Sequence, residues 1–364
     1  MDRSKVAATV SAICLTLVLV AIPFMGNCAE PSPKPSAQKP YELTCWGVRA
    51  GMTLYAYSVA LSDIARRHSK WLKINVIEGN ISPAIWASLD KPERRAHLVA
   101  AQDNRQRWKY MSGLFGADKI KYDWTKVRYL FLINFLVDGL VTLDPKIKTF
   151  KDLKGKRVSF GSTPKSDFDF IFGKLLEFEG MTFKDLASFE YMHMQAQADA
   201  LKDGLLDVAV VGYSLESLDP VKLGASPFAT ELAETKKLHF MDMNPDAVRH
   251  VSKLVPSGLV YVPAGSLKGQ TKEHIGISKS LAFVCDLDLP DEVVTEIARL
   301  VYEHAGEFAK FVPVGKIMSK NTMCAIGRPG EEFHPAMWKF MQQHGIRSNQ
   351  ILEGIPGTQG IIRK

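Results

Sequence analysis

Hydrophobic and polar positions follow two different periods along the chain after residue 40. Short apolar runs with strand character alternate with segments in which apolar residues recur at helical spacing. The clearest helix is expected over Thr53–His68, where Tyr57, Leu61 and Ile64 fall on one face. The repeated order of strand, loop and helix predicts an α/β fold with parallel strands.

This pattern divides into two sets of elements, one before and one after Pro145, which predicts two lobes. Strands are expected at 43–48, 73–77, 97–101, 128–143, 156–160, 189–192, 208–211, 259–262 and 275–284. Helices are expected at 53–68, after Ser82-Pro83, after a cap at Asp103, and at 168–180, 195–203, 290–311 and 335–343.

The first 40 residues have a different pattern. Arg3 and Lys5 precede an almost wholly apolar run at 6–25, and small or polar residues follow as far as Ala29. This order predicts a secretory signal over residues 1–29, followed by a Pro-rich linker over residues 30–40. The body would then lie outside the cytoplasm, in the periplasm.

Three fates of the signal stay open. The apolar run is also long enough to serve as an uncleaved membrane anchor, and Cys28 would carry a lipid if it belonged to a lipid-attachment motif. Asn27 stands where such a motif has a small residue, so plain cleavage is favoured.

Composition narrows the class of the body. The chain is 46% hydrophobic and 23% charged, which is typical of globular domains. Its formal net charge of +7 comes from scattered basic residues, which argues against nucleic acid as a partner and for a mild attraction of anions. Of five cysteines, Cys45, Cys285 and Cys324 belong to the body. One disulfide among them stays open, but three buried thiols are favoured.

Motifs for catalysis and cofactors are absent from the sequence. It contains no HExxH, GxSxG, CxxC, P-loop or GxGxxG pattern. In Met192-His193-Met194, read as a strand, the two methionines share one face, so core packing is favoured over a metal site. His334 before Pro335 is interpreted as a helix cap or a buried hydrogen-bonding group. We therefore expect no catalytic residue, no resident metal and no cofactor.

Candidate ligand-binding residues lie in five loops that follow predicted strands. In open α/β sheets, ligands bind beyond the carboxyl ends of the strands, and helix N-termini there attract anions. The candidates are Arg49, Thr53, Tyr55, Asn80, Ser82, Gln102, Asp103, Ser162, Thr163, Ser166, Asp167 and Tyr213. Each has an alternative structural role as a cap, a turn or a surface ion pair, but together they favour a small polar ligand.

Five short motifs, in order, point to a family. They are DLKGKRV from Asp152, ALKDG from Ala200, VPAG from Val262, DLPD from Asp288 and HPA from His334. Over residues 43–346 the chain resembles the TAXI group of solute receptors of tripartite ATP-independent periplasmic (TRAP) transporters. The loops around Arg49, Asn80 and Thr163 depart from the usual family sequences, so the fold carries over better than the ligand.

The resemblance implies a bilobed periplasmic-binding-protein fold of type II, with a hinge and a central cleft. Lobe 1 would comprise residues 41–141 together with a return and C-terminal helices at 273–350, lobe 2 residues 142–272, and a tail residues 351–364. The chain would be a non-enzymatic receptor that delivers an organic acid or amino acid to TRAP membrane subunits. Arg49 would pair with a carboxylate and Asp103 with an ammonium group.

Three alternatives remain. A receptor of an ATP-driven (ABC) importer for sulfonate-like or thiamine-precursor-like compounds shares the same fold. A periplasmic enzyme would use His334 or Asp103. A ligand sensor would signal to a membrane kinase.

Overall fold

A single mixed sheet organises the chain from Pro40 onward. The structure, a computed structural model, describes residues 39–48, 50, 53–79, 91–113, 121–162, 164–218, 221–320, 322–323 and 333–346. The predicted signal, almost all of the predicted linker and the tail lie outside these residues. No helix in the described ranges has both the length and the apolar character needed to cross a membrane.

Most of the predicted strands and helices that fall on described residues are present, and the predicted helix after Ser82-Pro83 lies outside the described residues. The strands are β1 Tyr41–Trp46, β2 Leu72–Ile77, β3 Leu98–Asp103, β4 Val127–Thr142, β5 Arg157–Ser159, β6 Ser188–Glu190, β7 Val208–Leu218, β8 Val221–Ala225, β9 His239–Met241, β10 Gly258–Val262 and β11 His274–Asp286. The α-helices are α1 Thr53–His68, α3 Pro92–Arg95, α4 Arg105–Met111, α5 Asp167–Phe178, α6 Met194–Lys202, α7 Pro227–Thr235, α8 Pro245–Leu254, α9 Asp291–His304 and α10 Pro335–Gln343. The 3₁₀ turns are η2 Trp124–Lys126, η3 Phe150–Leu153, η4 Phe183–Asp185, η5 Ala305–Lys310 and η6 Pro313–Ile317.

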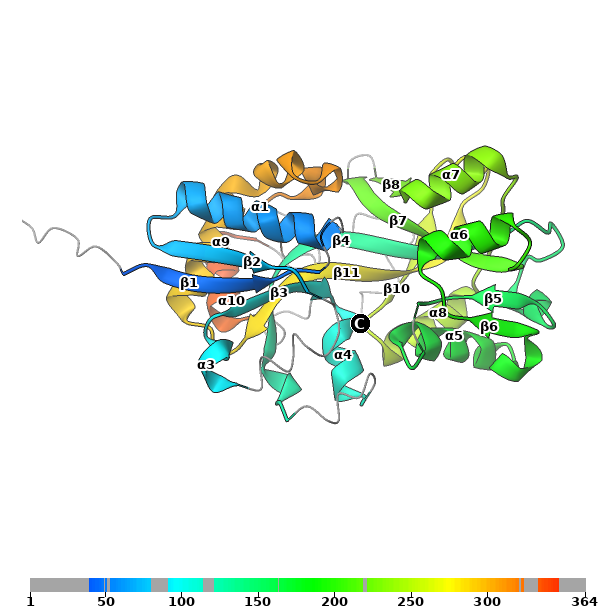
Figure 1. Cartoon of the computed structure of the whole chain (residues 1–364), viewed down its shortest axis with the longest axis horizontal. Coiled ribbons are helices and arrows are strands. Elements are labelled where there is room, and N and C mark those ends of the chain that lie inside the picture. Colours follow the sequence, from blue (N-terminus) through cyan, green and yellow to red (C-terminus); the bar gives the residue numbers. More distant parts are fainter. Residues whose placement is uncertain are drawn as a thin grey trace, which may run out of the picture. The chain divides into compact units, whose positions relative to one another are not determined.

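Two long antiparallel strands join two parallel sets in this sheet (Figure 1). The strand order is β2-β1-β3-β11-β4-β7-β5-β6, with β10 on β11, β8 on β7 and β9 on β4. β4 pairs with β11 along its first part and with β7 along its last part, from Leu136 to Thr142. The chain therefore passes along β4 from a first half, which contains β1, β2 and β3, to a second half, which contains β5, β6 and β7. It returns along β11.

The helices bury their apolar faces against this sheet. One core collects side chains of α1, α9, α10, α6 and α7, and the other collects side chains of α5 and α8. In α1, Tyr57, Leu61 and Ile64 are fully buried, as their helical spacing predicts. The predicted bounds of α1 and α10 agree with the structure residue for residue.

Three predicted elements differ from the structure. The predicted helix 290–311 ends at His304, because the chain tightens into η5 and brings Phe308 into the core, 5.7 Å from Tyr57 between ring centroids. The predicted strand 208–211 continues to Leu218 as β7, because Gly212 and Tyr213 pair with Asp138 and Val137 of β4.

The third difference concerns Met192-His193-Met194, which is not a strand. His193 is the N-cap of α6, and its Nδ1 accepts a hydrogen bond from the Ala196 amide at 3.1 Å. The β8, α7, β9 and α8 elements between residues 221 and 254 have no counterpart in the sequence prediction. Cys45 and Cys285 are buried free thiols, as favoured, and Cys324 lies outside the described residues.

Candidate functional site

Polar side chains interrupt β4 and β11 where these strands change partners between the two halves. Asp138 of β4 is buried, and its Oδ2 lies 3.1 Å from Nζ of Lys279 on β11. Ser278 and Ser280 flank Lys279 and are buried as well. Charges this deep are retained only when they have close partners, so the middle of the sheet is built around a polar site.

Helix α4 brings two more cations to this site. Arg105 is fully buried, and its guanidinium donates to the Ser278 carbonyl at 2.9 Å and to Ser257 Oγ at 3.1 Å. A third nitrogen, Nη1, lies 3.3 Å from Oδ2 of Asp167, and Nζ of Lys109 lies 2.9 Å from Oδ1 of the same residue. We name Arg105, Lys109 and Lys279, with their partners Asp138 and Asp167, the ion cluster.

Asp167 is the first residue of α5 and connects the two halves. Burial of its carboxyl group would raise the pKa, but Lys109, Arg105 and Lys279 together outweigh this effect and lower the pKa below its ordinary value. The carboxylate is therefore ionised at neutral pH, and it holds α4 of the first half to α5 of the second.

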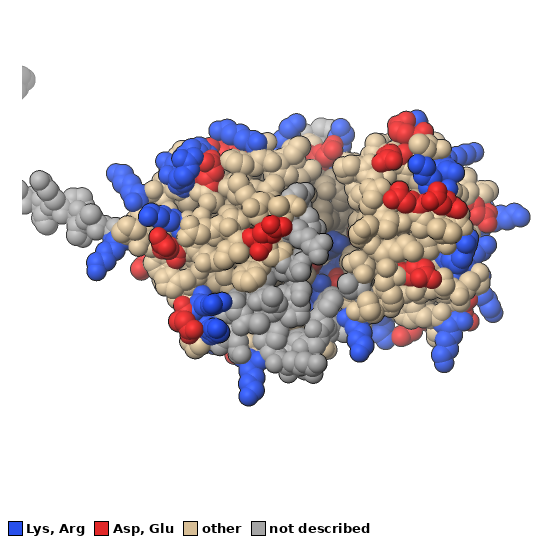
Figure 2. Space-filling view, in the orientation of Figure 1, with Lys and Arg blue, Asp and Glu red and all other residues tan. Residues whose placement is uncertain are grey.

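Aromatic rings support the same junction. Phe168, which follows Asp167, lies with its ring centroid 4.5 Å from Lys279 Nζ and 5.8 Å from Arg105 Cζ. Trp108 of α4 packs edge-on against Phe170 of α5, at 5.0 Å between centroids. Figure 2 shows the described surface hollowed between the two halves, with basic and acidic side chains together at the bottom of the hollow.

Four of the twelve predicted residues lie on the two chain segments that form this junction. Asp103 ends β3; its Oδ1 accepts from the Arg105 amide at 2.9 Å and its Oδ2 from Gln106 Nε2 at 3.1 Å. The N-cap position of α4 is Asn104, not the predicted Asp103. Gln102 is buried, and its Oε1 has no hydrogen-bond partner among the described residues. Ser166 is the N-cap of α5, directly before Asp167.

Four other predicted residues lie in the described part of the chain, outside the ion cluster. Thr53 and Ser162 are exposed, and Tyr55 is half-buried in α1. Tyr213 is a buried residue inside β7 and not a loop residue, and its hydroxyl has no partner among the described residues. Arg49, Asn80, Ser82 and Thr163 lie outside the described residues.

Sequence reasoning missed Arg105, Lys109, Asp138 and Lys279. The signal for the last two was present, because Asp138 is a charge inside a long apolar run and Lys279 stands between two serines in another. A charge inside a buried strand needs a partner, and that requirement predicts a polar site at this level of the sheet.

His334 serves the structure, as its interpretation from the sequence predicted. It caps α10, with Nδ1 accepting from the Ala336 amide at 3.3 Å and Nε2 facing the Leu287 carbonyl at 3.2 Å. Both ring nitrogens thus have backbone partners. Burial lowers the pKa of the imidazole.

The contribution of the Ser166 cap to the stability of the fold can be measured. Its Oγ accepts from the Asp169 amide at 3.3 Å at the start of α5, so Ser166→Ala is expected to lower the free energy of unfolding by about 1 kcal/mol. Ser162→Ala, on the exposed side of the same loop, is the control and should change it by less than about 0.5 kcal/mol. Equal values for the two variants in urea titrations would contradict the cap.

The fold and its central site define a class. Two parallel α/β sets are joined by the long paired strands β4 and β11, and a polar site lies at their junction. This arrangement is the bilobed periplasmic-binding-protein fold. The chain belongs to the NMT1-like family, whose model matches residues 49–345. No curated protein is a significant match to this sequence.

Solved structures are similar at low identity. A TctC solute-binding protein from Polaromonas is 16% identical, with coverage of 78% of this chain and 89% of that chain and a TM-score of 0.46. MatC from Rhodopseudomonas palustris, solved with bound malate, is 12% identical, with coverage of 85% and 98% and a TM-score of 0.44. Likenesses at this level carry no argument about the ligand of this chain.

Proposed function

We propose that this chain is an extracytoplasmic solute-binding receptor that captures a small anionic organic solute, an organic acid or an amino acid. The observation that carries the proposal is the ion cluster, which gathers Arg105, Lys109 and Lys279 at the junction of the two halves. Buried cations that are already held in place lose little freedom when an anion binds.

The charge balance of the cluster supports an anionic ligand. Its three cations face the two buried carboxylates of Asp138 and Asp167. A solute carboxylate would balance the remaining positive charge. Asp103, half-buried beside Arg105, adds a negative charge at the edge of the cluster, where the ammonium group of an amino acid would bind. In this proposal the cluster takes the carboxylate-binding role that the sequence assigned to Arg49.

The two halves would act as lobes that close on the solute by a hinge motion. We place lobe 1 at residues 41–141 and 273–350 and lobe 2 at 142–272, so that β4 and β11 carry the hinge. Arg105 and Lys109 on one side and Asp167 on the other would hold the lobes together. The solute would bind between them and share the same cations.

For the membrane partner, we propose TRAP-type subunits, on the strength of the five TAXI-like motifs of the sequence. A receptor of an ABC importer is the alternative. Genes for TRAP membrane subunits beside the gene for this chain would support the proposal, and genes for an ATPase and a permease would overturn it.

Export is part of the same proposal. The signal over residues 1–29 is expected to be cleaved near Cys28 or Ala29, which releases the receptor into the periplasm. Mass spectrometry of the mature N-terminus tests this point. An acylated Cys28 would show instead that the receptor is tethered.

A thermal-shift screen tests the ligand class. Carboxylates and amino acids should raise the melting temperature, while neutral sugars should not, because a ligand stabilises the folded state by RT ln(1 + [L]/Kd). Lys109→Met leaves Asp167 paired with Arg105 and should weaken binding roughly ten- to hundredfold, the share of one charge-assisted hydrogen bond.

Lys174→Met is the matched control. Lys174 lies on α5 and pairs with Glu177 at 2.6 Å outside the ion cluster, so its loss should leave calorimetric affinity unchanged. The anion proposal fails if no anion stabilises the protein, or if Lys109→Met binds as tightly as the wild type.

A further inference from the structure

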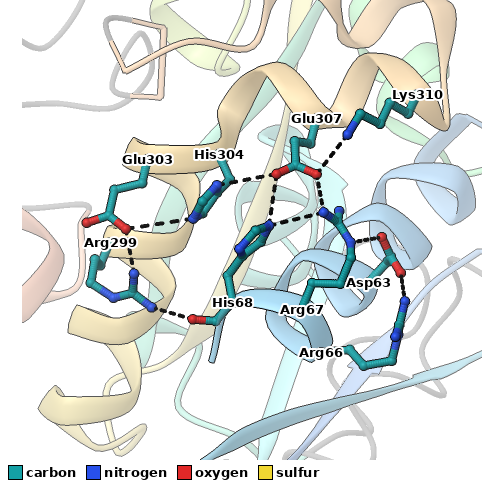
Figure 3. A network of polar contacts seen from close by, with 9 residues as sticks. All are labelled: Asp63, Arg66, Arg67, His68, Arg299, Glu303, His304, Glu307 and Lys310. Carbon is teal, nitrogen blue, oxygen red and sulfur yellow. Dashed lines mark hydrogen bonds and ion pairs between the residues drawn. The ribbon is translucent and has the colours of Figure 1, made fainter. Parts of the chain in front are cut away.

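A second polar cluster lies at the C-terminal end of α1. His68 is the last residue of α1, His304 is the last residue of α9, and Glu307 follows in η5 (Figure 3). The imidazole rings are stacked, with centroids 3.6 Å apart and planes 11° apart. Thr53 begins α1 at the opposite end of the helix from this cluster.

The two oxygens of Glu307 have different surroundings. Oε1 faces both histidines, at 2.9 Å from His68 Nε2 and 3.3 Å from His304 Nδ1. Oε2 faces two cations, Arg67 Nη1 and, at 3.1 Å, Lys310 Nζ. The cations therefore orient the carboxylate so that one oxygen points at two imidazole nitrogens.

The nitrogens around Oε1 can serve as electron-pair donors. His68 Nε2 lies 3.1 Å from Arg67 Nη1, which can only donate a hydrogen bond, and 2.9 Å from Glu307 Oε1. In the tautomer with its proton on Nδ1, the Nε2 atom accepts from Arg67, and a cation between Nε2 and Oε1 is favoured. On His304, Nε2 lies 3.7 Å from Glu303 Oε2. A proton on Nε2 leaves the lone pair of Nδ1 directed at Oε1.

The convergence of two imidazole nitrogens on one carboxylate oxygen is the feature that favours a metal ion. As hydrogen-bond donors, the two neutral rings would compete for the same Oε1, whereas one divalent ion would accept electron pairs from both nitrogens and from Oε1 at once. The three ligand atoms lie within 4.8 Å of one another. Ligands that each lie about 2.0–2.2 Å from a zinc ion require such proximity, after a modest rotation of the side chains.

We propose that His68, His304 and Glu307 bind a divalent transition-metal ion of the Zn²⁺ class. Two imidazoles and one carboxylate suit zinc, whereas Mg²⁺ and Ca²⁺ prefer all-oxygen ligands. Both histidines end helices, where the partial negative charge of the helix favours a cation. The side chains are 28%, 23% and 17% exposed, which leaves a path for the ion and room for a water ligand.

The surrounding residues are suited to support such an ion. Glu303 faces the second nitrogen of His304, in the position of the carboxylates that orient metal-binding histidines. Arg67 keeps a second partner, with its Nε 2.7 Å from Asp63, so it stays in place if Glu307 shifts toward the metal. Bound metal would fasten the end of α1 to α9 and η5.

The experiment uses tag-free, chelator-treated protein and ZnCl₂ as the probe. Calorimetry should give one strong site per chain, zinc should raise the melting temperature, and MgCl₂ should do neither. Co²⁺ in place of zinc should give visible d–d absorption. The variants His304→Ala and Glu307→Gln should each weaken zinc binding at least tenfold.

His250→Ala is the matched control, because His250 is an exposed histidine on α8 outside this cluster, and its loss should leave zinc affinity unchanged. Circular dichroism of each variant verifies that the fold persists. The proposal is overturned if zinc does not bind with one-to-one stoichiometry, or if His304→Ala and His68→Ala bind it as tightly as the wild type. It stands independently of the solute, which binds at the other cluster.

Discussion

Asp167→Asn is expected to lower the free energy of unfolding by about 3–5 kcal/mol, among the largest effects of any single substitution in the chain. The variant keeps the size of the side chain but leaves Arg105 and Lys109 buried with no carboxylate between them. Urea titration of ligand-free protein measures the loss. Glu177→Gln, an exposed carboxylate on the same helix, is the control and should cost less than about 1 kcal/mol.

The same variant should change the acid sensitivity of the protein. The pKa of Asp167 is lowered from 3.8 to about 2, so its carboxylate stabilises the fold above about pH 4, and this share is lost as the pH falls toward the folded pKa. Other carboxylates titrate in both proteins and cancel in the comparison. The difference in stability between wild type and Asp167→Asn should therefore shrink from pH 5 to pH 2. A constant difference would contradict the ionised state of Asp167.

Phe283→Ala is the second substitution with a large expected effect. Phe283 of β11 is fully buried and stacks on Phe131 of β4, at 4.8 Å between centroids. Truncation leaves a cavity beside Phe131 on the face of the sheet that β4 and β11 share, and it should cost about 3–5 kcal/mol. Differential scanning calorimetry or urea titration measures it.

Phe311→Ala controls for the removal of a phenyl ring. Phe311 is 36% exposed, so its loss should cost less than half as much as the loss of Phe283. Equal losses of stability for the two variants would show that β4 and β11 do not form the core of the first half.

The sequence predicts much of this fold because helical and strand periods are strong where one face is buried. Helix α1 shows this. Its apolar positions recur along the whole helix, and the basic residues Arg66, Arg67 and His68 mark its C-terminal end. Tyr213 shows the opposite case, because Gly212 before it resembles a turn, although it lies in the middle of a paired strand. Local sequence cannot reveal that β4 and β8 pair with that strand.

The site was harder to predict than the fold. Asp103 and Asp167 were found because each lies between a predicted strand and the helix expected after it. Arg105 and Lys109 look like ordinary charges of a surface helix, but their partners lie far away in the sequence: Asp167 of α5 for both, and Ser257 and Ser278 for Arg105. The stacking of His68 on His304 likewise depends on two helices that are far apart in the sequence.

The position of β11 between β3 and β4 has a consequence for the order of synthesis. Both neighbours are synthesised before residues 143–273, and β11 follows only after that whole segment. Until then, the edges that β3 and β4 present to β11 have no partner strand, which leaves them open to pairing with other chains. The first half can therefore complete its sheet only when the chain as far as residue 286 is available, and a chain that lacks β11 would expose these two edges.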